Sequence, residues 1–132
     1  MPAILSRRSP SRAWLAVFAW MALTVILSTF PVDRIQPSVP DADKLGHAAV
    51  YCVLALLCAR AWHRQGSSPA AAIERAMALV LVFGALLEFV QSFVGRDPSM
   101  GDWLADGAGA LVGVGLWKAW RIVLDWTPER WG

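Results

Sequence analysis

Nine ionisable or hydrogen-bonding side chains lie within or beside apolar stretches of this chain and could carry chemistry. They are Asp43, Lys44, His47, Tyr51, Glu88, Gln91, Arg96, Asp102 and Asp106. His47 could exchange protons near neutral pH, with Glu88 as its acid or base partner. Lys44 and Arg96 could bind a phosphate or carboxylate, Arg96 through its planar guanidinium, and could stabilise charge that develops in a reaction. These residue types therefore point to acid–base catalysis or to the recognition of an anion.

Each of these side chains also has a purely structural interpretation. His47 could be a helix-end histidine bonded to Asp43 or to a lipid headgroup, and Glu88 could be held by a cation of the same set. Asp102 could begin a helix, where a carboxylate caps free amide groups and meets the positive end of the helix dipole. That account does not explain Asp106 one turn further on, so catalytic, binding and structural roles all stay open.

The composition indicates which elements must position these residues. Of the 132 residues, 57% are hydrophobic and 17% are charged, so the apolar content exceeds the roughly half that is usual in a soluble domain. Four apolar runs cover residues 14–30, 45–62, 76–94 and 103–124, and each is near the roughly 20 residues that cross a bilayer core. We expect an all-α, polytopic four-helix transmembrane bundle that forms one domain over residues 1–132.

The distribution of lysine and arginine predicts how this bundle is oriented. If the N-terminus is cytoplasmic, nine of these residues fall on the cytoplasmic side, namely Arg7, Arg8, Arg12, Arg60, Arg64, Arg75, Lys118, Arg121 and Arg130. Only Arg34, Lys44 and Arg96 fall on the other side. Because cytoplasmic loops carry the excess of positive charge, we expect both termini to be cytoplasmic and the positive residues there to act as topology determinants. This orientation carries the candidate side chains toward the outer leaflet.

Helical periodicity predicts which faces of the runs meet, because residues three or four positions apart share a face of a helix. The shared faces are formed by Asp43, His47, Tyr51 and Leu54 in the second run, by Gly84, Glu88 and Gln91 in the third, and by Asp102, Asp106, Gly109 and Gly113 in the fourth. The two glycines at a spacing of four would let another helix approach closely. A carboxylate such as that of Glu88 is costly in lipid, so we expect these faces to converge on one polar cluster.

The order of these motifs along the chain is distinctive. It is Asp43-Lys44-x-x-His47-x-x-x-Tyr51, then Glu88-x-x-Gln91 followed by Arg96, then Asp102-x-x-x-Asp106-Gly107-x-Gly109-Ala110-x-x-Gly113. This set, over roughly residues 41–117, resembles the VanZ-like membrane protein family. The family more often carries asparagine where this chain has Asp106. The resemblance implies a cell-envelope role in the bacterial inner membrane, and the family's founding member is linked to low-level resistance to the glycopeptide teicoplanin.

Three functions are compatible with these observations. The leading hypothesis is a cell-envelope protein whose polar cluster binds or acts on an amphiphilic ligand with an anionic headgroup, such as a lipid-linked precursor or a glycopeptide antibiotic. The alternative is a non-catalytic structural or partner subunit of envelope machinery, in which the cluster only fixes helix packing. A third is a proton-coupled permease, which four short helices could form only as a homo-oligomer.

The sequence also narrows the partners to be considered. No tight metal-ligand spacing occurs, so no metal site is predicted, and no nucleic-acid partner is expected. The lipid bilayer is the partner that the apolar runs require. No motif identifies a cofactor, and the residues leave open whether the protein catalyses a reaction.

The predicted orientation can be tested with reporter fusions. Fusions after Ser68 and after Gly132 should read as cytoplasmic, whereas fusions within residues 32–41 and near Pro98 should read as external. The reason is the bias of nine positive residues against three. A cytoplasmic signal from the fusion near Pro98 would contradict the four-span topology.

Overall fold

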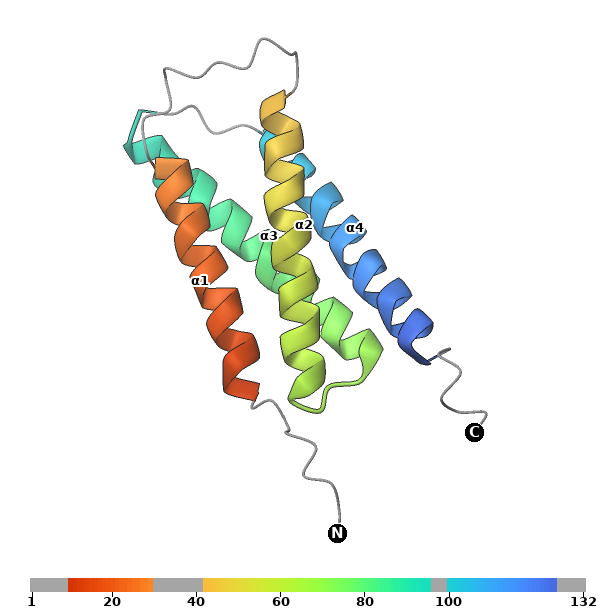
Figure 1. Ribbon diagram of the computed structural model, residues 1–132. Helices are drawn as coiled ribbons and strands as arrows, with labels where there is room; N and C mark the ends of the chain where they lie inside the picture. Colours follow the sequence, from red (N-terminus) through yellow and green to blue (C-terminus); the bar gives the residue numbers. More distant parts are fainter. Residues whose placement is uncertain (1–9, 30–41, 96–99, 126–132) are drawn as a thin grey trace, which may run out of the picture.

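The computed structural model describes residues 10–29, 42–95 and 100–125. These residues form four helices, α1 (Pro10–Thr29), α2 (Ala42–Arg64), α3 (Pro69–Phe93) and α4 (Met100–Asp125) (Figure 1). No strand occurs in these ranges. Each helix is long and apolar enough to cross a membrane, which confirms the predicted all-α bundle of four potential spans.

The turn between α2 and α3 explains the one clear difference from the predicted boundaries. The third apolar run was expected from residue 76, but α3 begins at Pro69. Ser68 caps the helix by accepting a 3.2 Å hydrogen bond from an amide of the first turn, and proline suits the first helical position because no amide hydrogen is needed there. Just before it, α2 ends in a Schellman motif, in which Ser67 N–H donates to Trp62 O and Gly66 has a φ of +100°. Caps, not hydropathy, decide where the helix begins.

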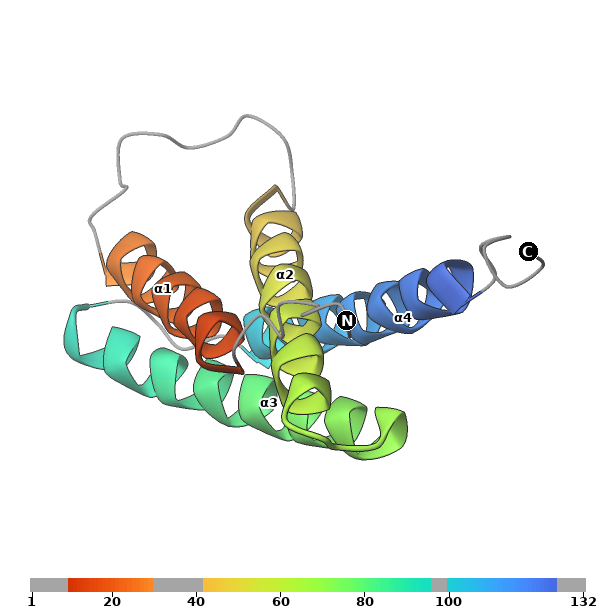
Figure 2. The same cartoon turned by 60° about the horizontal axis from the view of Figure 1, so that its bottom comes forward.

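Helix α2 lies in the middle of the bundle and packs against the other three helices. Helices α1 and α4 lie on opposite sides of it in both views (Figure 1 and Figure 2), and the described parts of these two helices do not pack against each other. The chain reverses direction from each helix to the next (Figure 1). We call the end where α2 and α4 begin the His47 end, and the end where α2 finishes the His63 end. The topology therefore carries the first turns of α2 and α4 and the last turns of α3 to the His47 end.

The core of the bundle is built mainly from small side chains. Among the buried residues are Ala55, Cys58, Ala59 and Ala61 on α2, Ala72 and Ala76 on α3, and Ala110 on α4. Lipid gives helices no hydrophobic reason to associate with one another, so close packing of small residues is a principal source of attraction. This composition lets the helices approach closely along most of their contact.

Helices α2 and α4 are in backbone contact at two glycines. A methyl group added to Gly109 would overlap the carbonyl of Ala48, and one added to Gly113 would overlap the carbonyl of Cys52. Both pairs are spaced by four residues, so one turn of α4 lies directly against one turn of α2. The glycine pair predicted from the sequence as a packing device is therefore used for that purpose, and its partner is α2.

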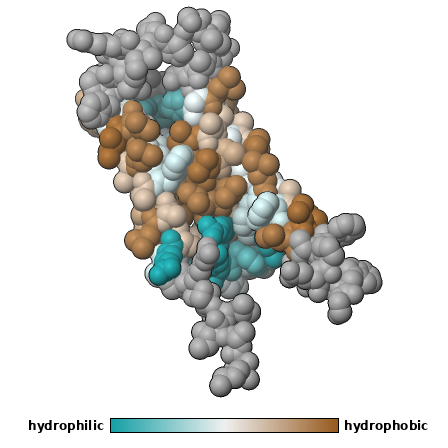
Figure 3. Space-filling view, viewed as in Figure 1, coloured by the Kyte–Doolittle hydropathy of each residue, from teal (hydrophilic) through white to brown (hydrophobic). Residues whose placement is uncertain are grey.

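Large apolar side chains cover the outside of the helices. Leu15 and Phe18 on α1, Phe89 on α3, and Leu111 and Ile122 on α4 are all exposed. The middle of the face seen in Figure 3 is covered mostly by hydrophobic residues, and hydrophilic residues gather toward the His63 end. Exposed apolar area of this extent marks contact with another apolar phase, and with four helices of spanning length that phase is lipid.

The glycine contact predicts the effect of added volume on folding. Gly109→Leu and Gly113→Leu should each lower the free energy of unfolding by at least about 1–3 kcal/mol, because the new side chain must push α4 away from α2. The measurement is thermal unfolding and yield of the purified protein in detergent. Gly115→Leu is the matched control, because no atom lies within 4 Å of the position that its Cβ would take. Equal stability of all three variants would show that α2 and α4 do not meet at this face.

Candidate functional site

His47 and Asp106 form a hydrogen-bonded pair that joins α2 to α4, although 59 positions separate them in the sequence. The distance from Nδ1 of His47 to Oδ1 of Asp106 is 3.1 Å. When Asp106 is ionised, its carboxylate can only accept hydrogen bonds, and Nδ1–H of His47 is then the donor. Any proton exchange between His47 and a ligand must then pass through Nε2. This makes Asp106 the residue that orients the imidazole.

The two members of the pair differ in exposure. The side chain of Asp106 is 1% exposed, whereas that of His47 is 16% exposed. A buried carboxylate is costly unless it is hydrogen-bonded, and the bond to His47 offsets part of that cost. The imidazole is therefore the member of the pair that a molecule outside the bundle can reach.

Gly84 on α3 provides the space for the second carboxylate oxygen of Asp106. A methyl group at Gly84 would lie 3.0 Å from Oδ2 of Asp106 and 3.5 Å from the ring of Tyr51. Oδ2 is buried, and no donor in the described part of the chain bonds to it. An acceptor left in this state costs about 1–3 kcal/mol, and more when it is charged. Such a cost inside a polar cluster is a reason to consider a function for the cluster.

The ring of Tyr51 lies beneath the pair. It is parallel to the imidazole of His47, with an interplanar angle of 3° and 6.5 Å between ring centroids, and it also contacts Phe83 on α3. Tyr51 is only 2% exposed. Tyr51 follows His47 by four residues, one turn further along the same face of α2. Helix α2 therefore supplies both the imidazole and the aromatic ring that lies parallel to it.

Two further carboxylates lie within electrostatic range of these residues. Glu88 on α3 interacts with Tyr51, and Asp102 in the first turn of α4 interacts with Asp106. Glu88 is buried and Asp102 is half-buried, and each also takes part in an interaction with another group of the protein. Three helices thus contribute acidic or imidazole groups to one region at the His47 end.

The other predicted site residues have different positions. Gln91 is buried, but it turns toward α1, where its amide donates to the carbonyl of Ser28 at 3.4 Å. Lys44 is exposed in the first turn of α2. The side chain of Asp43 and the whole of Arg96 lie outside the described residues. The predicted residues that the structure brings together are His47, Tyr51, Glu88, Asp102 and Asp106.

Two neighbours of this cluster were not identified from the sequence. The indole of Trp103 donates to the carbonyl of Leu81 at 3.3 Å, and its ring would lie 3.7 Å from a methyl group at Gly84. Phe83 packs on Tyr51. The spacing of three between Trp103 and Asp106 could have indicated the first, because it puts the two side chains on one face of α4. Both aromatic rings limit the space around the pair.

The arrangement is suited to proton transfer or hydrogen bonding at His47. An imidazole oriented by a buried carboxylate is the usual form of a positioned acid or base. The group bonded to Nδ1 is Asp106, and the role of Glu88 as the acid or base partner of His47 stays a prediction. Within residues 10–29, 42–95 and 100–125, no three histidine, cysteine, aspartate or glutamate residues are grouped so that they could hold a metal ion.

Comparison with known proteins adds one finding to this geometry. A family model described as VanZ/LLP1 matches residues 13–121. The match extends over all four helices, including every described residue of the cluster. No curated protein and no solved structure matches the chain.

The bond between His47 and Asp106 can be measured by a double-mutant cycle. His47→Ala and Asp106→Ala should each lower the free energy of unfolding, and the two effects should be coupled by about 1.5–3 kcal/mol, because the bond involves a charged group. Thermal unfolding in detergent gives the four values. A control cycle uses Thr29→Ala and Lys118→Ala, two side chains on helices that do not contact each other, and should be additive. Additive effects in the first cycle would mean that the pair is not formed.

Proposed function

The chain belongs to the VanZ/LLP1 family, and from this membership and the geometry of the His47 end we propose that it is a bacterial cell-envelope protein that binds an amphiphilic ligand with an anionic headgroup. We propose further that it lies in the inner membrane with both termini cytoplasmic, so that the His47 end meets the outer leaflet. The bias of lysine and arginine supports this orientation. The observation that carries the proposal is the partly exposed imidazole of His47, oriented by the buried carboxylate of Asp106.

The residues around His47 suit the two chemical parts of such a headgroup. Lys44 lies on α2 three positions closer to the membrane surface and is exposed, so a phosphate or carboxylate at the surface would meet its ammonium group. Asp102, which is half-buried, is an acceptor that suits hydroxyl or amide hydrogens of the same headgroup. Leu45, which follows Lys44, is exposed as well, so apolar surface for a tail adjoins the polar groups.

The same geometry defines how His47 would act on a bound ligand. With Nδ1 bonded to Asp106, the Nε2 atom is the point at which the imidazole donates a hydrogen bond to the headgroup or exchanges a proton with it. Asp106 does not touch the ligand in this scheme, because its side chain is buried. It is a positioning residue, and asparagine at this position would keep the shape but weaken the hold on the imidazole.

A structural role for the cluster is the second candidate, and one observation favours it. The His47–Asp106 bond joins the two helices whose backbones touch at Gly109 and Ala48. His47 is next to Ala48 in sequence, so the bond could serve only to hold the register of this contact. In that case the protein would be a non-catalytic partner of envelope machinery, and His47 would matter for stability alone.

Ligand binding by the purified protein separates the two candidates. The probes are a polyprenyl phosphate, the matching polyprenol without phosphate, and teicoplanin, the last chosen because of the resistance linked to the family. Native mass spectrometry in detergent should show at least about tenfold tighter binding of the phosphate than of the alcohol, or about 1.4 kcal/mol. His47→Ala should remove this preference, and Asp106→Asn should reduce it. Binding of teicoplanin should depend on His47 in the same way.

The control variant is Lys118→Ala, which removes an exposed positive charge of α4 far along the helix from Asp106 and should leave binding unchanged. Thermal unfolding is recorded for every variant, so that a loss of binding can be separated from a loss of structure. If folded His47→Ala and Asp106→Asn bind all three probes as the natural chain does, the ligand-binding proposal is wrong and the structural role is favoured.

A further inference from the structure

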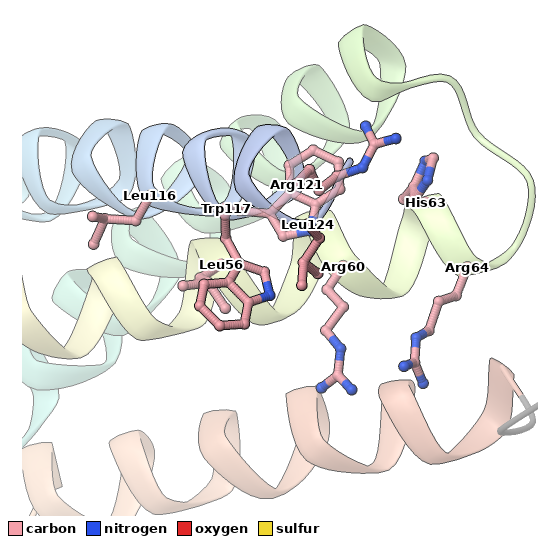
Figure 4. A pocket seen from close by; sticks show the side chains of 9 residues that line it. Leu56, Arg60, His63, Arg64, Leu116, Trp117, Arg121 and Leu124 are labelled. Atoms are coloured by element: carbon pink, nitrogen blue, oxygen red, sulfur yellow. The ribbon is translucent and has the colours of Figure 1, made fainter. Parts of the chain in front are cut away.

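A pocket lies between α2 and α4 at the His63 end, away from the His47–Asp106 pair. Its volume is about 580 Å³, within the range of pockets that hold small ligands. The side chains that line it in the described chain include three arginines and no acidic residue. Arg60 and Arg64 come from successive turns of α2, and Arg121 comes from α4 (Figure 4). This pocket does not share a residue with the candidate site described above.

The three arginines make the pocket attractive to an anion. Arg60 and Arg64 are four positions apart, so their guanidinium groups are neighbours on one helix face and extend on the same side in Figure 4. Like charges at this spacing repel one another, and an anion that contacts both of them lowers the repulsion. The guanidinium of Arg121 extends to the opposite side, near His63, and adds positive charge to the pocket without pointing at the same place. Arginine can bond a phosphate through two parallel N–H groups. Phosphate is therefore the group that this part of the pocket fits best.

The remaining lining residues are apolar or aromatic. Leu56 on α2 and Leu116 and Leu124 on α4 contribute to the pocket, and both leucines of α4 are about half exposed, at 52% and 51%. Leu56 and Leu116 continue the apolar surface of the helices toward the middle of the span, whereas Leu124 lies near the end of α4. A ligand that used the whole pocket would thus combine an anionic group with a hydrocarbon tail.

Aromatic side chains hold the polar part of the pocket in place. The guanidinium of Arg121 lies 5.2 Å from the ring centroid of Trp117, and this ring meets that of His63 edge to face at 5.5 Å. His63 is itself fixed, because its Nδ1–H donates to the carbonyl of Ser67 at 2.9 Å in the turn after α2. Trp120 also lines the pocket. Tryptophan prefers the headgroup level of a membrane, which agrees with a pocket at the ends of two spans.

We propose that this pocket binds an anionic glycerophospholipid of the surrounding membrane, with the phosphate at Arg60 and Arg64 and an acyl chain along Leu56 and Leu116. Basic pockets between helices on the cytoplasmic side are a known way of recognising such headgroups. A role as topology determinants needs only that the arginines lie on one side of the membrane. It does not need arginines of two helices to line one pocket together with apolar side chains. The proposal does not depend on a ligand at the His47 end.

The test compares lipids that share their acyl chains. The purified protein is titrated in native mass spectrometry with phosphatidylglycerol, with phosphatidylcholine, and with inorganic phosphate as a soluble anion. Phosphatidylglycerol should bind about tenfold more tightly than phosphatidylcholine, and inorganic phosphate at the same concentration should not displace it. The double variant Arg60→Gln/Arg64→Gln should lose the preference between the two lipids.

The matched control is Arg12→Gln/Lys118→Gln. It removes two positive charges that are exposed and do not line the pocket, and it should keep the full preference for phosphatidylglycerol, as should His47→Ala. An equal loss in the control would mean that net charge attracts the lipid, and displacement by phosphate would mean that the site takes a soluble anion. Equal binding of both lipids by the natural chain would overturn the proposal without any variant.

Discussion

The backbones of α2 and α4 touch where Gly109 and Gly113 face the carbonyls of Ala48 and Cys52. No side chain separates the two helices there, so their relative rotation and register are held tightly. His47 directly precedes Ala48, and Asp106 precedes Gly109 by three positions. Once the glycines are in contact, the imidazole and the carboxylate have to be neighbours. The same contact fixes the other ends of α2 and α4, so the pocket lined by Arg64 and Arg121 also follows from it.

The cost of polar groups in lipid then limits what the cluster at the His47 end can be. The carboxylate of Asp106 is buried at the contact, bonded through one oxygen to His47 and placed by the other against Gly84. Replacing Gly84 by a larger residue would crowd this oxygen. Helix α3 therefore contributes to the cluster by leaving space for the carboxylate where a side chain would otherwise be. The rings of Tyr51 and Trp103 lie beside the same position of α3. A site assembled this way is rigid, and its specificity would come from the position of His47 and not from loops that close over a ligand.

Much of this could be predicted from the sequence, because periodicity and hydropathy are properties of single helices. The burial of Gly84, Glu88 and Gln91 follows from their spacing on α3. Periodicity does not say which neighbour a buried face meets. Gln91 therefore turned out to donate to Ser28 of α1, and periodicity did not single out Asp106 as the residue bonded to His47. The arginines of the His63 end were interpreted only as topology determinants, since their place in one pocket depends on how α2 and α4 are rotated against each other.

Two bonds between helices are made by tryptophan to the backbone of its neighbour. The indole of Trp20 on α1 donates to the carbonyl of Val50 on α2 at 3.0 Å, and that of Trp103 on α4 donates to the carbonyl of Leu81 on α3. A helix carbonyl has a second lone pair that can accept such a bond. Because the acceptor is the main chain, no substitution at position 50 or 81 deletes it, short of one that breaks the helix. These two hydrogen bonds should therefore persist when the side chains at positions 50 and 81 change during evolution. A membrane protein of this size can then vary much of its lipid-facing and core sequence and still keep the same helices as neighbours.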